Sequence, residues 1–201
     1  MTSATADRSE FRHVLLSGTI VGVATAAAVI VFLVISRLLP AGIVTALLET
    51  IVVLAGAIAA AFLPAHFAAS RTVQGVASAA AIGLWGTIVF MAIDIILLRP
   101  FRAFPWTWDA VGGGSTWWYL PIWWMLGTFL AWMGALVTAG RAARGRDTSV
   151  KALAVPIVLT AAVLGLAPVA ARFPIYLPVA VGGAFALALT AFAVVAIARK
   201  V

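Results

Sequence analysis

Six apolar runs, each long enough to cross a membrane as a helix, dominate this sequence of 201 residues. They occupy residues 14–39, 43–68, 73–98, 117–140, 151–171 and 175–198. A helix rises about 1.5 Å per residue, so about 20 apolar residues cross the ~30 Å hydrocarbon core of a bilayer. The runs do not alternate apolar and polar residues, as the strands of a membrane barrel do. The sequence therefore predicts an all-α polytopic membrane protein, a bundle of six transmembrane helices forming one domain over residues 1–201.

The composition excludes a water-soluble globule. Apolar residues make up 65% of the chain, charged residues only 9%, and the mean hydropathy is +1.17. Soluble domains contain about 45–50% apolar and about 25% charged residues. A body of this size cannot bury so much apolar surface inside itself, and a disordered chain would contain far less of it. We therefore expect a lipid bilayer to be the main partner of the chain.

The basic residues predict the orientation of the bundle. Nine of them lie at span ends on one side and four on the other. The first group is Arg8, Arg12, Arg71, Arg141, Arg144, Arg146, Lys151, Arg199 and Lys200, and the second is Arg37, Arg99, Arg102 and Arg172. Because basic residues accumulate on the cytoplasmic side, both termini are expected to be cytoplasmic, in a cytoplasmic (inner) membrane. The same rule accounts for the net charge of +7, so no nucleic-acid partner is predicted.

Two acidic residues, Glu49 and Asp94, lie inside the predicted spans near their outer ends. An ionisable group costs about 2.5–3.5 kcal/mol at the centre of a membrane helix, so it usually has a function. The spans 43–68 and 73–98 are adjacent and antiparallel, which predicts that the two carboxylates lie at similar depth and can meet. An outer aromatic loop over residues 99–116 follows directly.

These features leave two interpretations of the outer end. In the first, a ligand or ion site forms at the outer mouth, where acids bind a cation or carry a proton and arginines hold an anionic group. Its expected members are Arg37, Glu49, Asp94, Arg99, Arg102, Trp106 and Trp108. In the second, an arginine neutralises one of the acids and locks the helices together. The residue pattern alone favours neither strongly enough to discard the other.

Further residues are candidates for contact with lipid or with a partner protein. Tryptophan gathers at membrane interfaces, and arginine near the membrane attracts anionic lipid. The candidates are Trp117, Trp118, Trp123, Trp124, Arg141, Arg144 and Arg146. The Gly18–Gly22 pair and the alanine-rich stretch 55–61 favour close helix packing, either within one bundle or against partner subunits or a second copy.

No catalytic motif is present in the sequence. It contains no cysteine, and it lacks a nucleophile elbow, a zinc-protease motif and a P-loop. His13 and His66 are interpreted as interfacial polar residues, so neither haem, nor metal, nor another cofactor is predicted. We expect a non-enzymatic transport component that binds a small solute or ion. The alternatives are an assembly subunit, docking through Ala/Gly-rich helix faces and the tryptophan-rich loop, and an intramembrane enzyme acting on lipid.

Overall fold

The computed structural model describes residues 3–98, 119–171, 173 and 175–198, and these residues are helical apart from short connections. The elements are α1 (Ser3–Leu38), α2 (Ile43–Phe67), α3 (Val73–Ile93), a π-helical turn η1 (Asp94–Leu98), α5 (Tyr119–Ala142), α6 (Val150–Ala170) and α7 (Leu177–Ala198). Six helices are long and apolar enough to cross a membrane, and the described ranges contain no strand. The prediction of an all-helical, multi-pass membrane protein is confirmed.

The predicted spans and the observed helices differ mainly at their ends. α1 begins at Ser3, well before the predicted start at residue 14, because a polar first segment can be helical without being apolar. Its membrane-compatible part runs over Glu10–Leu38. The third span ends in η1, a feature that hydropathy cannot predict. The loop predicted over residues 99–116 lies outside the described residues.

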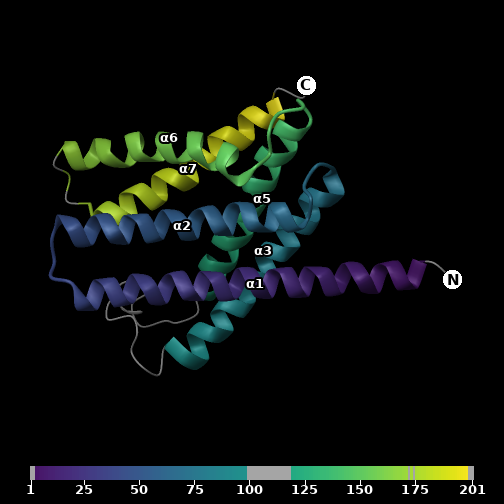
Figure 1. Ribbon diagram of the computed structural model, residues 1–201, viewed down its shortest axis with the longest axis horizontal. Coiled ribbons are helices and arrows are strands. Elements are labelled where there is room, and N and C mark those ends of the chain that lie inside the picture. Colours follow the sequence, from purple (N-terminus) through teal and green to yellow (C-terminus); the bar gives the residue numbers. More distant parts are fainter. Residues whose placement is uncertain (1–2, 99–118, 172, 174, 199–201) are drawn as a thin grey trace.

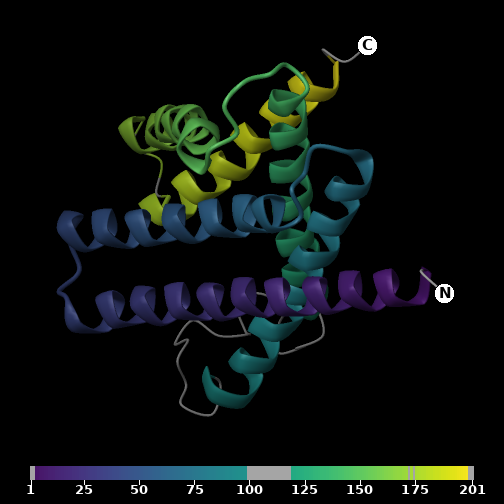
Figure 2. The ribbon, with the colours of Figure 1, turned by 45° about the vertical axis from the view of Figure 1, so that its right-hand side comes forward.

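The helices form a bundle in which α1 and α2 run antiparallel. α3 starts beside the end of α2, crosses α1 and ends on the side of α1 away from α2 (Figures 1 and 2). α5 contacts α2, α3 and α7, and α6 packs against α7. α1 begins and α7 ends at the same end of the bundle (Figure 1). We call this the arginine end, which also holds the connections 68–72 and 143–149. The opposite end, with the turn 39–42 and Tyr176, is called the glutamate end.

Small residues allow these helices to approach closely, as expected for association inside lipid. A Cβ atom placed on Gly22 of α1 would lie 2.5 Å from the carbonyl oxygen of Gly86 on α3, and one on Gly18 would lie 2.7 Å from Trp85. Gly134 of α5 packs in the same way against the backbone of Ala61 on α2. The glycine pair of α1 and part of the alanine-rich stretch of α2 are therefore used for packing within this chain.

The main apolar core lies between α2, α5, α6 and α7. Phe62, Ile157, Phe185 and Leu189 are almost completely buried there. Other large apolar side chains face outward, and Leu187 is 69% exposed. Such an outer surface is costly in water and favourable in hydrocarbon, which agrees with a membrane setting.

Candidate functional site

Glu49 is the centre of the best-defined polar site. It lies in the second turn of α2, near the glutamate end, and only 2% of its surface is exposed. A carboxylate so deeply buried needs hydrogen-bond donors, because the loss of water otherwise disfavours its charge. The structure supplies such donors from two other segments of the chain.

Both carboxylate oxygens of Glu49 accept a hydrogen bond from a hydroxyl group. The Oγ atom of Ser36, in the last turn of α1, donates to Oε1 at 2.6 Å. The phenol of Tyr176, just before α7, donates to Oε2. We call Ser36, Glu49 and Tyr176 the Glu49 cluster. Three segments therefore meet at one carboxylate, and Glu49 and Tyr176 are 127 positions apart in sequence.

Local structure at the glutamate end holds these residues in place. The tight turn after α1 places the last turn of α1 beside the first turns of α2, and Thr45 Oγ1 closes this turn by donating to the carbonyl of Pro40 at 2.7 Å. The backbone carbonyl of Tyr176 accepts from the amides of Val179 and Ala180, which joins it to the first turn of α7. The Glu49 cluster is thus attached to three well-formed elements.

The Tyr176 phenol remains a hydrogen-bond donor over the physiological pH range. Loss of water around the phenol, followed by its hydrogen bond to Glu49 and the charge of that carboxylate, raises the pKa of Tyr176 to about 12. A phenolate next to a carboxylate would place two negative charges together, so the neutral phenol is favoured. Ser36 and Tyr176 were not among the predicted site residues. Their only signal in the sequence is their polarity at positions that flank apolar helices.

Asp94, the second predicted acid, does not join the Glu49 cluster. It is completely buried in η1, where it interacts with another group of the chain. η1 lies on the far side of α1 from the first turns of α2 in both views (Figures 1 and 2). The expectation that the two carboxylates meet is therefore wrong. The two acids are separated because α3 crosses α1. Spans that are adjacent in sequence need not pack along their whole length.

The remaining predicted outer residues have different outcomes. Arg37, next to Ser36, is exposed at the end of α1 and interacts within the chain. The rings of Trp123 and Phe90 pack in an edge-to-face arrangement, with centroids 5.4 Å apart, whereas Trp124 is 43% exposed on α5. The predicted roles of the others stay predictions, because these residues lie outside the described ranges: Arg99, Arg102, Trp106, Trp108, Trp117 and Trp118.

The two histidines lie near the arginine end, and each contacts Phe67. His13 Nε2 is 3.0 Å from the carbonyl oxygen of Phe67, a contact that links α1 to the end of α2. The ring of His66 lies against Phe67. Within the described residues, no group of three metal-ligating side chains is present.

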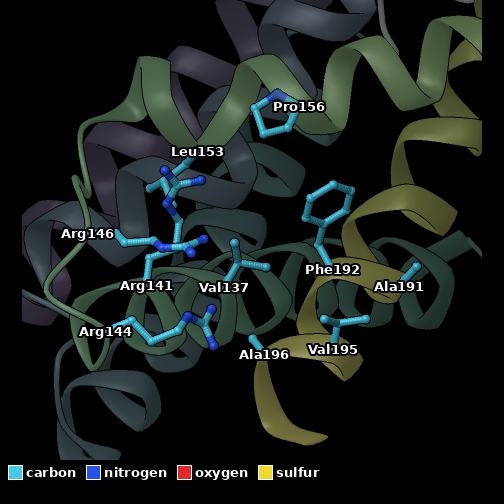
Figure 3. Close-up of a pocket in the computed structure, with 10 residues that line it drawn as sticks. All are labelled: Val137, Arg141, Arg144, Arg146, Leu153, Pro156, Ala191, Phe192, Val195 and Ala196. Carbon is cyan, nitrogen blue, oxygen red and sulfur yellow. The ribbon is translucent and has the colours of Figure 1, made fainter. Parts of the chain in front are cut away.

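The three arginines predicted to contact lipid lie together at the arginine end. Arg141 is in the last turn of α5, and Arg144 and Arg146 follow in the loop to α6. They line a pocket of about 320 Å³ between α5, α6 and α7, opposite apolar side chains (Figure 3).

Comparisons of the chain with protein-family models, with curated proteins and with solved structures find no match. The class of the protein therefore rests on its own helices. Their length, apolar composition and outward-facing apolar side chains define a small polytopic membrane protein.

Proposed function

We propose that this protein is a small membrane transport component that binds a proton or a small cation at the Glu49 cluster. One observation carries this proposal: a carboxylate 2% exposed, inside an apolar helix, accepts hydroxyl hydrogen bonds from two other segments. Acidic groups in membrane helices are costly, and they mark ion and proton pathways.

The chemistry of the cluster suits a change of protonation state. When Glu49 is ionised, both hydroxyls donate to it. When Glu49 takes up a proton, its new O–H group needs an acceptor, and a serine hydroxyl can rotate to accept. The Ser36 hydroxyl therefore serves both states without movement of the helices. A small hard cation would use the same carboxylate and hydroxyl oxygens as ligands.

The position of the cluster links occupancy to helix arrangement. Glu49 joins α2 to the end of α1 through Ser36 and to the start of α7 through Tyr176. Neutralising the carboxylate weakens both charge-assisted hydrogen bonds, which are about twice as strong as neutral ones. Binding thus changes how firmly α1 and α7 are held to α2, which a transport cycle requires.

The charge distribution supports an outward-facing cluster in a cytoplasmic membrane. The arginine end holds Arg71, Arg141, Arg144 and Arg146, and basic connections favour the cytoplasmic side. The glutamate end would then face outward, and ions would reach Glu49 from that side.

Flux measurements test the proposal. Protein reconstituted into liposomes with an internal pH dye is exposed to a proton gradient, and then to sodium or potassium gradients. Glu49→Gln is expected to abolish flux, and Ser36→Ala and Tyr176→Phe are expected to reduce it. Glu10→Gln is the matched control, because Glu10 is an exposed acid on α1 far from the cluster.

Two outcomes would overturn the assignment. Full flux with unchanged thermal stability in Glu49→Gln would show that Glu49 takes no part in the pathway. Full flux with lower thermal stability in Glu49→Gln would show that the Glu49 cluster is only a structural contact. Should Glu49→Gln fold poorly, infrared difference spectra of the wild-type protein and of Tyr176→Phe supply the second readout. A carboxyl band that does not respond to pH or to cations in either protein would also refute the proposal.

The assembly-subunit alternative has less support. It relied partly on Ala/Gly-rich faces, and Gly18, Gly22 and Ala61 pack against helices of this same chain. Its other element, the tryptophan-rich loop, lies outside the described residues. Partner subunits and a homo-oligomer remain untested predictions.

A further inference from the structure

The pocket at the arginine end combines two opposite surfaces. Arg141, Arg144 and Arg146 lie along one side, and Phe192 and Pro156 lie along the other (Figure 3). Its volume of about 320 Å³ is at the lower end of the ~300–1,000 Å³ typical of small-molecule sites. A ligand that matches this pocket carries an anionic group on one side and an apolar group on the other.

The loop that carries the arginines is held in shape by its own hydrogen bonds. α5 ends in a turn in which the amide of Arg146 donates to the carbonyl of Arg141 at 3.1 Å and that of Gly145 donates to Ala142 at 3.0 Å. Gly145 has φ of +62°, a conformation that favours glycine at this helix-ending position. The turn reverses the chain, so Arg144 and Arg146 come back beside Arg141.

The acid in this loop is already engaged by other groups. Asp147 accepts hydrogen bonds from the amide of Ser149 at 2.8 Å and from its hydroxyl at 2.7 Å, next to the start of α6. Its backbone carbonyl accepts a hydrogen bond from Nε of Arg141 at 3.1 Å. Among the described residues, no side chain forms a hydrogen bond or ion pair with Arg144 or Arg146. Positive charge therefore remains available in the pocket.

We infer that this pocket binds an anionic phospholipid, with the arginines contacting its phosphate and the apolar wall contacting the start of an acyl chain. Guanidinium groups bind phosphate through paired hydrogen bonds. Arg141 lies in the last turn of α5, a helix long and apolar enough to cross a membrane, and the ends of such helices reach the level of lipid headgroups. Basic pockets between membrane helices bind such headgroups.

The apolar wall favours a lipid over a water-soluble phosphate ester. Val195 and Ala191 are exposed on α7, inside its membrane-spanning segment, and they also line the pocket. The pocket is therefore continuous with the outer surface of α7, from which an acyl chain can enter. A soluble phosphate ester would gain nothing from this wall.

Lipid binding to the full-length chain in a neutral detergent tests the inference. The probes are fluorescent phosphatidylglycerol and phosphatidylcholine with identical acyl chains. Phosphatidylglycerol is expected to bind more tightly. Each Arg→Gln change in the pocket is expected to weaken the binding of phosphatidylglycerol about five-fold. The double variant Arg144→Gln/Arg146→Gln is therefore expected to weaken this binding about 25-fold. Arg141 is left intact because it also holds the loop.

Arg71→Gln is the matched control. It removes the same charge at the same end of the bundle, in a connection that does not line the pocket, so binding of phosphatidylglycerol should not change. Ala191→Phe places a ring in the pocket from an exposed position, and it should weaken phosphatidylglycerol binding while leaving all arginines in place.

The outcomes are decisive for this site and independent of ion flux. Equal binding of phosphatidylglycerol by the wild type and the double arginine variant would overturn the inference. If Arg71→Gln weakened phosphatidylglycerol binding as much as an Arg→Gln change in the pocket does, the preference would come from the overall positive charge of this end and not from the pocket. Displacement of the labelled lipid by glycerol 3-phosphate at concentrations comparable to phosphatidylglycerol would assign the pocket to a soluble phosphate ester instead. If the double variant does not fold, Ala191→Phe alone decides, and undiminished binding there refutes an acyl-chain contact.

Discussion

Gly22→Ala tests the close packing of α1 on α3, on which the separation of the two acids depends. A Cβ atom at this position would lie 2.5 Å from the carbonyl oxygen of Gly86 and 2.7 Å from Cβ of Val89. Ordinary van der Waals contacts begin near 3.4 Å, and neither of these atoms can rotate away. The two helices must therefore move apart by almost 1 Å at their crossing.

The size of the effect follows from that movement. A gap of 0.5–1 Å forfeits about a quarter to a half of the dispersion energy of the contacts involved, and overpacking of this kind costs about 1–3 kcal/mol. Backbone contact places Gly22→Ala in the upper part of this range. The better helix propensity of alanine returns up to about 1 kcal/mol. We expect a net loss of about 1–2 kcal/mol in the free energy of unfolding.

The assay is reversible unfolding in mixed micelles with increasing SDS, followed by far-UV circular dichroism. Gly183→Ala in α7 is the control, because a Cβ atom placed at Gly183 would have no neighbour within 4 Å. It shares the gain in helix propensity without the clash, so the two variants should differ by about 2–3 kcal/mol. Equal unfolding midpoints for both variants would refute the close contact of α1 with α3.

Two further predictions concern pH. In a Tyr119→Phe background, ultraviolet titration should show Tyr176 ionising near 12 rather than near 10, so its contribution to stability is present below pH 10 and lost as pH rises through about 12. Glu49→Gln should lower this pKa part of the way, because loss of water around the phenol remains, and an unchanged titration would exclude a contact with Glu49. In the 143–149 loop, hydrogen bonds from the side chain and backbone of Ser149 and the charge of Arg141 lower the pKa of Asp147 below its ordinary value of 3.8. Its stabilisation of the loop is thus complete above that value and is lost as pH falls through the lower, folded-state pKa. Hydrogen exchange at the Ser149 amide should accelerate with acid in the wild type, relative to intrinsic rates, but not in Asp147→Asn; identical pH dependence in the two proteins would contradict this.

Much of the architecture could be predicted from the sequence because crossing hydrocarbon is a local requirement. Each span needs its own length and hydropathy, so all six were found, with the main difference at the polar first turns of α1. The third span was found with its bounds, although its π-helical end was not predicted. The gathering of arginines around the α5–α6 loop was equally visible, since it depends on neighbours in the chain. Glu49 also stood out, because an acid within an apolar run is conspicuous wherever it packs.

The tertiary structure alone decided which residues meet. Helices that are apolar on every side carry no periodic signal for the face that turns inward. Close contacts such as that of Gly22 with Gly86 made α3 cross α1, and this crossing separated Asp94 from Glu49. The partners of Glu49 come from the end of α1 and the start of α7, and the apolar wall facing the arginines comes from α6 and α7. These are contacts between distant parts of the chain, and they depend on how neighbouring surfaces fit together rather than on any property of a single span.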